Sequence, residues 1–88
     1  MEKDTFESEL KASGYNNIET KILEPKQPNT EHAHDYDIYG LVTQGTFIVW
    51  LDRKPASFKA GQVFAVPAGK KHSEEVGPDG AHILVGRK

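Results

Sequence analysis

The residues of this sequence best suited to chemistry are histidines, and two of the four, His32 and His34, are separated by a single residue. In an extended segment, residues two apart point to the same side of the backbone, so both imidazoles can approach one ion. Neutral imidazole is the commonest metal ligand in proteins. The chain has no cysteine, so a metal would be held by imidazole, carboxylate or water. Two close histidines are also common in polar loops, and this pair alone leaves both interpretations open.

A third histidine, His72, ends a segment with the landmarks of a buried strand and a tight reversal. Gly61 permits a turn into the strand, Pro67 ends the strand, and Gly69 allows the chain to reverse. This arrangement predicts that His72 returns along a sheet to the mouth of a barrel. A metal site made of three histidines becomes the favoured interpretation.

The elements that must position these histidines are mostly strands. Residues 4–13 predict one short helix, which ends at Gly14 because glycine suits a left-handed stop. Residues 18–22 alternate as in a half-buried strand. Gln44 and Gly45 predict a tight hairpin, and residues 77–80, Gly-Pro-Asp-Gly, predict a turn. Further strands are expected at 36–43, 46–51, 57–59, 63–66, 73–76 and 81–86.

Many short strands with turn residues between them indicate an all-β fold, a small antiparallel β-barrel or jelly roll with one short N-terminal helix. No part of the chain alternates helix and strand, which argues against a parallel α/β sheet. We expect residues 1–16 to form a helical segment that packs on the barrel and residues 17–88 to form the barrel. With 88 residues the chain has little core to spare, so pairing of exposed edge strands predicts a homodimer.

Composition narrows the class of partners. The chain has 11 basic and 13 acidic residues, a net charge of −2, which argues against nucleic acid as a partner. No stretch approaches the roughly 20 apolar residues of a membrane span. The first residues lack the apolar run of a signal peptide, which favours a cytoplasmic protein. Arg87 and Lys88 are interpreted as a solvated tail.

Two motifs resemble those of the cupin family. The segment from Gly61 to His72 fits the second cupin motif, Gly-x5-Pro-x-Gly-x2-His, at every position. His32-x-His34, followed by Gly45 after a hydrophobic strand, resembles the first motif. The chain is similar to the small single-domain cupins of the RmlC-like superfamily, the type-2 cupin domains. The resemblance implies a divalent transition metal (zinc, iron, nickel, manganese or cobalt) on the three histidines and a small polar ligand in the barrel mouth.

The carboxylate that cupins use as a fourth ligand is not at its usual place. The first motif places Glu after three or four intervening residues, where this chain has Ile38 and Tyr39. Asp37, one residue earlier, is the candidate fourth ligand. Glu74 is its rival, because it shares one side of a regular strand with His72 and could bind the metal, orient a histidine or act as a general base. A solvated role stays open for both carboxylates.

The function implied by the resemblance is a metal-binding cupin whose reaction is unassigned and whose catalytic residues are unknown. The alternative is a non-catalytic cupin that senses or binds a ligand, with a structural metal only. Whether the chain is an enzyme stays open, since one barrel hosts many chemistries.

Overall fold

The computed structural model describes all residues from 1 to 88. Its elements follow in the order α1 (Lys3–Ala12), β1 (Asn16–Leu23), β2 (Ile38–Leu51), β3 (Lys54–Lys59), β4 (Val63–Val66) and β5 (His72–Arg87). The helix agrees with the predicted one to within a residue at each end. Gly14 follows it with a φ of 81°, the left-handed conformation expected of a helix stop.

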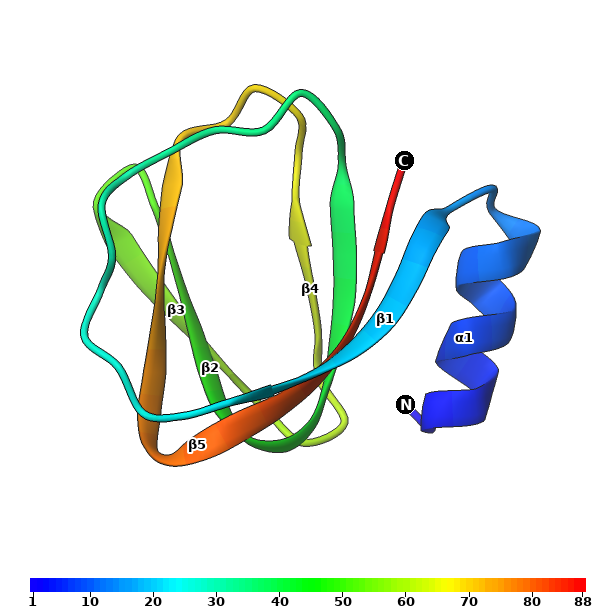
Figure 1. The fold of residues 1–88 in the computed structure, drawn as a ribbon, viewed down its shortest axis with the longest axis horizontal. Helices are drawn as coiled ribbons and strands as arrows, with labels where there is room; N and C mark the ends of the chain where they lie inside the picture. Colours follow the sequence, from blue (N-terminus) through cyan, green and yellow to red (C-terminus); the bar gives the residue numbers. More distant parts are fainter.

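The strands form one antiparallel sheet in which β2 and β5 are the long central members. The strand order is β1-β5-β2-β3, and β4 pairs with β2. One half of β2 pairs with β4 and the other half with β3, while β5 runs along both halves. Because these long strands bend, the sheet curls into a small barrel (Figure 1). The predicted all-β fold with one short helix is confirmed.

The hairpin predicted at Gln44 and Gly45 is wrong, because β2 continues through both residues. Both residues pair with β5, and the register shifts on each side of them, so they lie between two irregularities where the strand bends. Gly45 has a φ of 80°, and a side chain there would collide with the carbonyl group of Gly80 on β5. The tight connection lies after β2 instead, at Asp52 and Arg53, which have φ values of 51° and 64°.

The turn predicted at residues 77–80 is also wrong, because these residues lie inside β5. Along the β2–β5 pairing, β5 passes from Val76 to Ala81 while β2 passes only from Phe47 to Gly45. The extra residues of β5 form a bulge, and the strand keeps its pairing on both sides of them. The residues Gly-Pro-Asp-Gly at 77–80, which are typical of a turn, therefore form a bulge in a continuous strand.

Helix α1 packs on the outside of the barrel against β1, β2 and β5 (Figure 1). Phe6 and Leu10 lie on one face of the helix and are fully buried against Leu41 and Leu84. Burial of one such side chain stabilises a fold by about 1.5–3 kcal/mol, so the pair anchors a helix too short to be stable alone. The helix is neither long nor apolar enough to cross a lipid bilayer.

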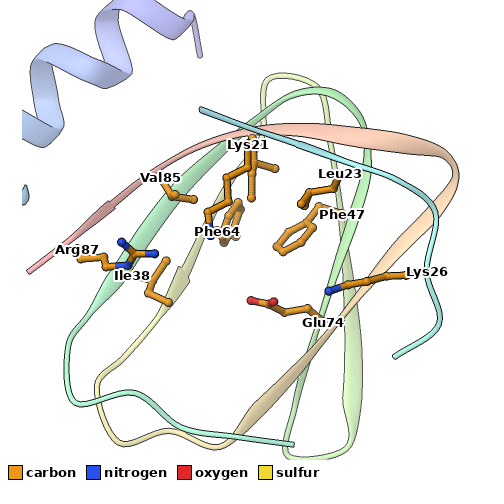
Figure 2. Close-up of a pocket in the computed structure, with 10 residues that line it drawn as sticks. Lys21, Leu23, Lys26, Ile38, Phe47, Phe64, Glu74, Val85 and Arg87 are labelled. Atoms are coloured by element: carbon orange, nitrogen blue, oxygen red, sulfur yellow. The ribbon is translucent and has the colours of Figure 1, made fainter. Parts of the chain in front are cut away.

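The main hydrophobic core lies inside the barrel, and a cavity lies beside it. Phe47 and Phe64 belong to this core, with ring centroids 4.9 Å apart, and they also line the cavity. The cavity has a volume of about 160 Å³. Charged side chains, among them Glu74 and Arg87, enter it from the surrounding strands (Figure 2). The barrel thus holds charged groups within an apolar frame.

Candidate metal centre

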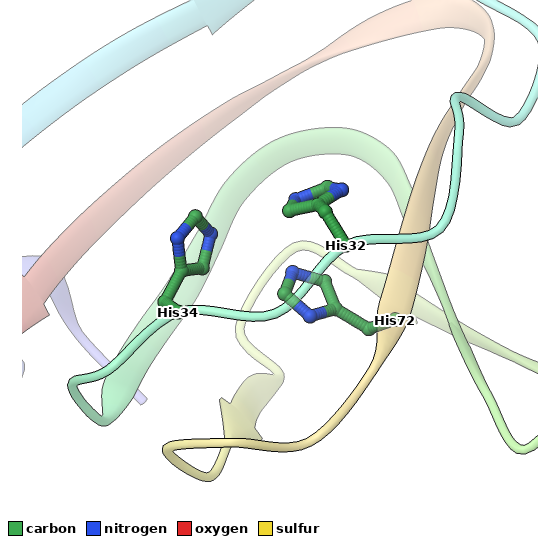
Figure 3. A group of neighbouring side chains, drawn as sticks. All are labelled: His32, His34 and His72. Carbon is green, nitrogen blue, oxygen red and sulfur yellow. The ribbon is translucent and has the colours of Figure 1, made fainter.

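The structure brings His32, His34 and His72 together (Figure 3). One potential ligand nitrogen from each ring lies within 4.8 Å of the other two. The ring centroid of His72 lies 4.4 Å from that of His32 and 5.3 Å from that of His34. The first two histidines come from the segment between β1 and β2 and the third from the start of β5, so two distant parts of the chain build the cluster.

Backbone hydrogen bonds hold these two parts of the chain together. His32 and His72 each donate an N–H to the carbonyl oxygen of the other, both at 2.8 Å. The N–H of Gly69, in the reversal before β5, donates to the carbonyl oxygen of His34 at 2.7 Å. Gly69 has a φ of 75°, a conformation that favours glycine. The reversal predicted from the sequence therefore supports the histidine pair directly.

The side chain of His72 is fully buried, but its hydrogen bonding is incomplete. Nδ1 lies 3.2 Å from the carbonyl oxygen of Lys70, which can only accept, so Nδ1 carries the proton. Nε2 is therefore an acceptor, and no group donates to it. A buried polar atom without a partner costs about 1–3 kcal/mol. The ring of His32 is held in the same way as that of His72, since its Nδ1 donates to the carbonyl oxygen of Thr30 at 2.9 Å.

These donors fit a divalent metal ion. Imidazole nitrogens bind zinc at about 2.1 Å, so two ligands of one ion lie at most about 4.2 Å apart. The ligand atoms here lie within 4.8 Å of one another. A side-chain shift of less than about 1 Å would satisfy a common ion. Hydrogen bonds from the second ring nitrogen to backbone carbonyls are the usual means of orienting metal-binding histidines.

The surroundings of His34 favour the neutral form of its imidazole. Partial burial lowers the pKa of His34, and the neighbouring rings of His32 and His72 lower it further, against an opposing effect of Glu74. The ring of Tyr36 stacks on His34 with centroids 4.8 Å apart and planes 16° from parallel. Because metals bind the neutral ring, a lowered pKa preserves the metal-binding form to lower pH.

Comparison with known proteins identifies the family. The family model of the cupin domain matches residues 20–84, which include all three clustered histidines. The chain belongs to the cupin family. The resemblance seen in the two sequence motifs is confirmed. The search of curated proteins finds no match for this cupin.

Solved structures share the fold of this cupin at low sequence identity. An RmlC-like cupin from Shewanella frigidimarina has a TM-score of 0.68 at 23% identity, covering 80% of this chain and 62% of that one. The EutQ protein of Clostridium difficile has a TM-score of 0.71 at 22% identity, covering 89% and 55%. A conserved protein of unknown function from Streptococcus pyogenes has a TM-score of 0.70 at 20% identity, covering 80% and 60%. This cupin spans less than two thirds of each of these proteins, and the likeness shows the fold.

The two carboxylates expected near the histidines of this cupin have different surroundings. Oε2 of Glu74 lies 3.7 Å from Nε2 of His72, and the Glu74 side chain lines the barrel cavity. Oδ1 of Asp37 accepts a hydrogen bond from the N–H of Ala68 at 2.7 Å. The backbone of Asp37 also exchanges two hydrogen bonds with Lys88. Neither carboxylate is among the clustered donor atoms, and that of Asp37 stabilises the reversal after β4.

Sequence reasoning misses three cations that line the cavity of this cupin. They are Lys21, Lys26 and Arg87. The interpretation of Arg87 as part of a solvated tail is wrong, because Arg87 lies in β5, above the ring of Tyr36 at 5.5 Å, and its guanidinium is 3.2 Å from Glu19. Strand parity is the signal that reveals it, since Arg87 lies on the same side of β5 as Ile83 and Val85, which line the cavity.

Proposed function

We propose that this cupin holds one divalent transition metal on His32, His34 and His72 and binds a small polar ligand in the barrel beside it. One observation carries the proposal. Nε2 of His72 is buried without a hydrogen-bond partner, next to two other imidazoles. Buried polar atoms are nearly always paired, and a leucine or phenylalanine would avoid the cost of an unpaired one. A bound cation explains why histidine occupies this position.

The ligand set limits the kind of metal. Three neutral imidazoles suit zinc, iron, nickel, manganese or cobalt. When bound, such an ion supplies Lewis-acid polarisation of a ligand or activation of a water molecule. The part played by the chain is orientation, because Nδ1 of His32 and Nδ1 of His72 donate to backbone carbonyls and leave both Nε2 lone pairs free.

Glu74 is the carboxylate that we assign to this site. Its Oε2 is 3.7 Å from Nε2 of His72, and its side chain is 26% exposed. From this position it can complete the ligand set or accept a proton from a molecule in the cavity. Asp37 remains the other candidate, but the hydrogen bond from Ala68 supports a role in the loop instead.

The cavity supports a second function, ligand binding without a reaction. Its lining combines apolar walls with charged groups and reaches the histidines through Glu74, so a ligand can be held there with or without chemistry. Incubation of the metal-loaded protein with a ligand that it binds separates the two functions. Ligand recovered unchanged supports the binding module, and ligand converted to product supports the enzyme.

The homodimer and the cytoplasmic location expected from the sequence stay predictions. Ile22 supports pairing, because its side chain is 73% exposed on β1, at one edge of the sheet. Light scattering that gives the mass of a monomer at high protein concentration would contradict a homodimer.

Metal analysis of protein purified without added metal tests the main proposal. We expect a single divalent metal in each chain, and a fall in melting temperature when a chelator removes it. His72→Ala and His32→Ala should lose the metal, whereas His82→Ala, a histidine of β5 outside the cluster, should keep it. A variant that loses metal and melts at the temperature of metal-free wild type indicates a functional metal, and one that does not fold indicates a structural metal. Native protein that carries no metal and is stabilised by no divalent ion contradicts the proposal.

A further inference from the structure

The cavity in the barrel has apolar walls and the size of a small ring. Its volume is about 160 Å³. An engineered apolar cavity of roughly 150 Å³ binds benzene, so a ligand body of about six to eight heavy atoms fits this space. Most of the lining is hydrophobic and consists of Leu23, Ile38, Phe47, Phe64, Ile83 and Val85.

The remaining lining residues are charged, and most of them are cations. They are Lys21, Lys26, Glu74 and Arg87. Figure 2 shows the charged ends of Arg87 and Lys26 entering the cavity from opposite sides, with the carboxylate of Glu74 between them. The chain as a whole has a net charge of −2, so this group of cations does not follow from a basic composition. Positive charge concentrated in an apolar recess indicates an anionic ligand.

The cavity has more cationic side chains than there are carboxylates near them. Glu19 lies 3.2 Å from Nη2 of Arg87 and 3.7 Å from Nζ of Lys21, and Lys26 forms no ion pair. In the metal-free chain, Glu74 and Glu19, which pairs with Arg87 and Lys21 from outside the cavity lining, leave a single positive charge on the three cations, which favours an anionic ligand. The guanidinium of Arg87 has five N–H donors, and the contact with Glu19 leaves others for a planar carboxylate.

We propose that this cavity binds a small monocarboxylic acid whose apolar body fills the recess and whose carboxylate pairs with Arg87, with Lys21 and Lys26 adding positive charge. Arg87 is held in place for this role, because its guanidinium lies 5.5 Å above the ring of Tyr36. The same ring stacks on His34. Tyr36 lies outside the cavity lining, and its ring connects Arg87 with the histidine cluster.

Charge also sets the orientation of the ligand. Glu74, beside Nε2 of His72, repels a second carboxylate. The carboxylate of the ligand is therefore directed to Arg87, and its opposite end lies toward Glu74 and the histidines. As a statement about the substrate of the metal centre, this inference rests on the proposed function, whereas the anion site itself rests on the cavity and its charges.

Benzoate and benzamide are matched probes, because they share a shape and differ in charge. Each is titrated into the ¹⁵N-labelled chain, with zinc added and after zinc removal, at constant ionic strength. We expect benzoate to bind at least about tenfold more tightly than benzamide in both states, since an arginine–carboxylate pair exceeds a neutral hydrogen bond. Arg87→Met should weaken benzoate binding about tenfold or more and leave benzamide unchanged. Lys54→Met, at an exposed position of β3, is the control and should change neither.

Several results would overturn the anion site. These are equal affinities for the two probes, equal losses in Arg87→Met and Lys54→Met, or no binding of benzoate at millimolar concentration. Benzoate that binds only with zinc and ignores Arg87→Met would also overturn it, because the carboxylate would then sit on the metal. Arg87-dependent binding of benzoate by protein that takes up no metal would support the anion site and refute the metal centre alone. If Arg87→Met does not fold, Lys26→Met must weaken benzoate and spare benzamide.

Discussion

Replacement of His72 by leucine separates the cost of its buried nitrogen from the benefit of a bound metal. In the metal-free protein, the unpaired Nε2 costs about 1–3 kcal/mol, and leucine removes it with little change in volume. The variant also loses the 3.2 Å hydrogen bond from Nδ1 to the carbonyl oxygen of Lys70, worth about 0.5–1.5 kcal/mol. The free energy of unfolding of metal-free His72→Leu should therefore lie between about 0.5 kcal/mol below and about 2.5 kcal/mol above that of metal-free wild type.

A bound metal should reverse this order. At a free metal concentration of 100 times Kd, binding adds about 2.7 kcal/mol to the free energy of unfolding. In a domain of this size, 1 kcal/mol shifts the melting temperature by about 4–8 °C. Wild type should thus gain about 10–20 °C with metal, and His72→Leu should gain nothing.

Urea unfolding with and without metal, followed by the fluorescence of the single tryptophan Trp50, measures both effects. His82→Leu is the control and should keep the full gain from metal, since His82 lies outside the cluster. A loss of more than about 2 kcal/mol in metal-free His72→Leu would mean that Nε2 is paired in the native protein, and the reasoning would fail. An undiminished gain from metal in this variant would refute it as well.

Further substitutions and a pH series test the fold and the electrostatics. Gly45→Ala should destabilise the protein by more than about 2 kcal/mol for two reasons. The added Cβ collides with the backbone carbonyl of Gly80, and alanine is strained at the positive φ of residue 45. Gly69→Ala, at a φ of 75° but with open space around it, should cost only about 1 kcal/mol. If urea unfolding shows the same loss of stability for Gly45→Ala and Gly69→Ala, the close approach of Gly45 to Gly80 is wrong. Asp37→Ala should lose about 0.5–1.5 kcal/mol with its exposed hydrogen bond from Ala68 and keep its metal content; loss of the metal would make Asp37 a ligand instead. Because the pKa of His34 lies below its ordinary value of 6.5, the unfolded chain binds this proton more readily than the folded one, so metal-free protein should lose stability as the pH falls below 6.5. His34→Gln should reduce that loss, and identical pH profiles for variant and wild type would show that the pKa is not lowered.

The sequence predicts the fold well where local pattern decides the structure. The segment from Gly61 to His72 carries its own turn, strand and reversal, and the structure reproduces them at the predicted residues. Whether a long strand continues or ends at a glycine is not decided by local sequence. Gly45 has the positive φ of a turn residue, but its close approach to Gly80 on a strand far along the chain makes it a bend inside β2. Glycine-rich motifs thus predict where the backbone must be unusual, without predicting whether it turns or bulges.

The candidate site divides in the same way. Motif spacing predicts that His32, His34 and His72 come together, because the residues just before His72 specify the reversal that returns it to the sheet. The role of a carboxylate depends on side-chain direction, and Asp37 is engaged by Ala68 through a contact that no local pattern reveals. Arg87 is missed because residues near the end of a chain are usually exposed to solvent. Its side chain nevertheless lies on the same side of β5 as apolar residues that line the cavity.

Anomalous diffraction from crystals of the native protein, collected on both sides of the zinc, iron, nickel, manganese and cobalt absorption edges, tests the central claim most directly. We predict a single anomalous peak within coordination distance of Nε2 of His72 and of the rings of His32 and His34, and the edge at which it appears would identify the metal. A water molecule or a protein donor paired with Nε2 of His72, with no anomalous peak among the three histidines, would contradict the metal centre.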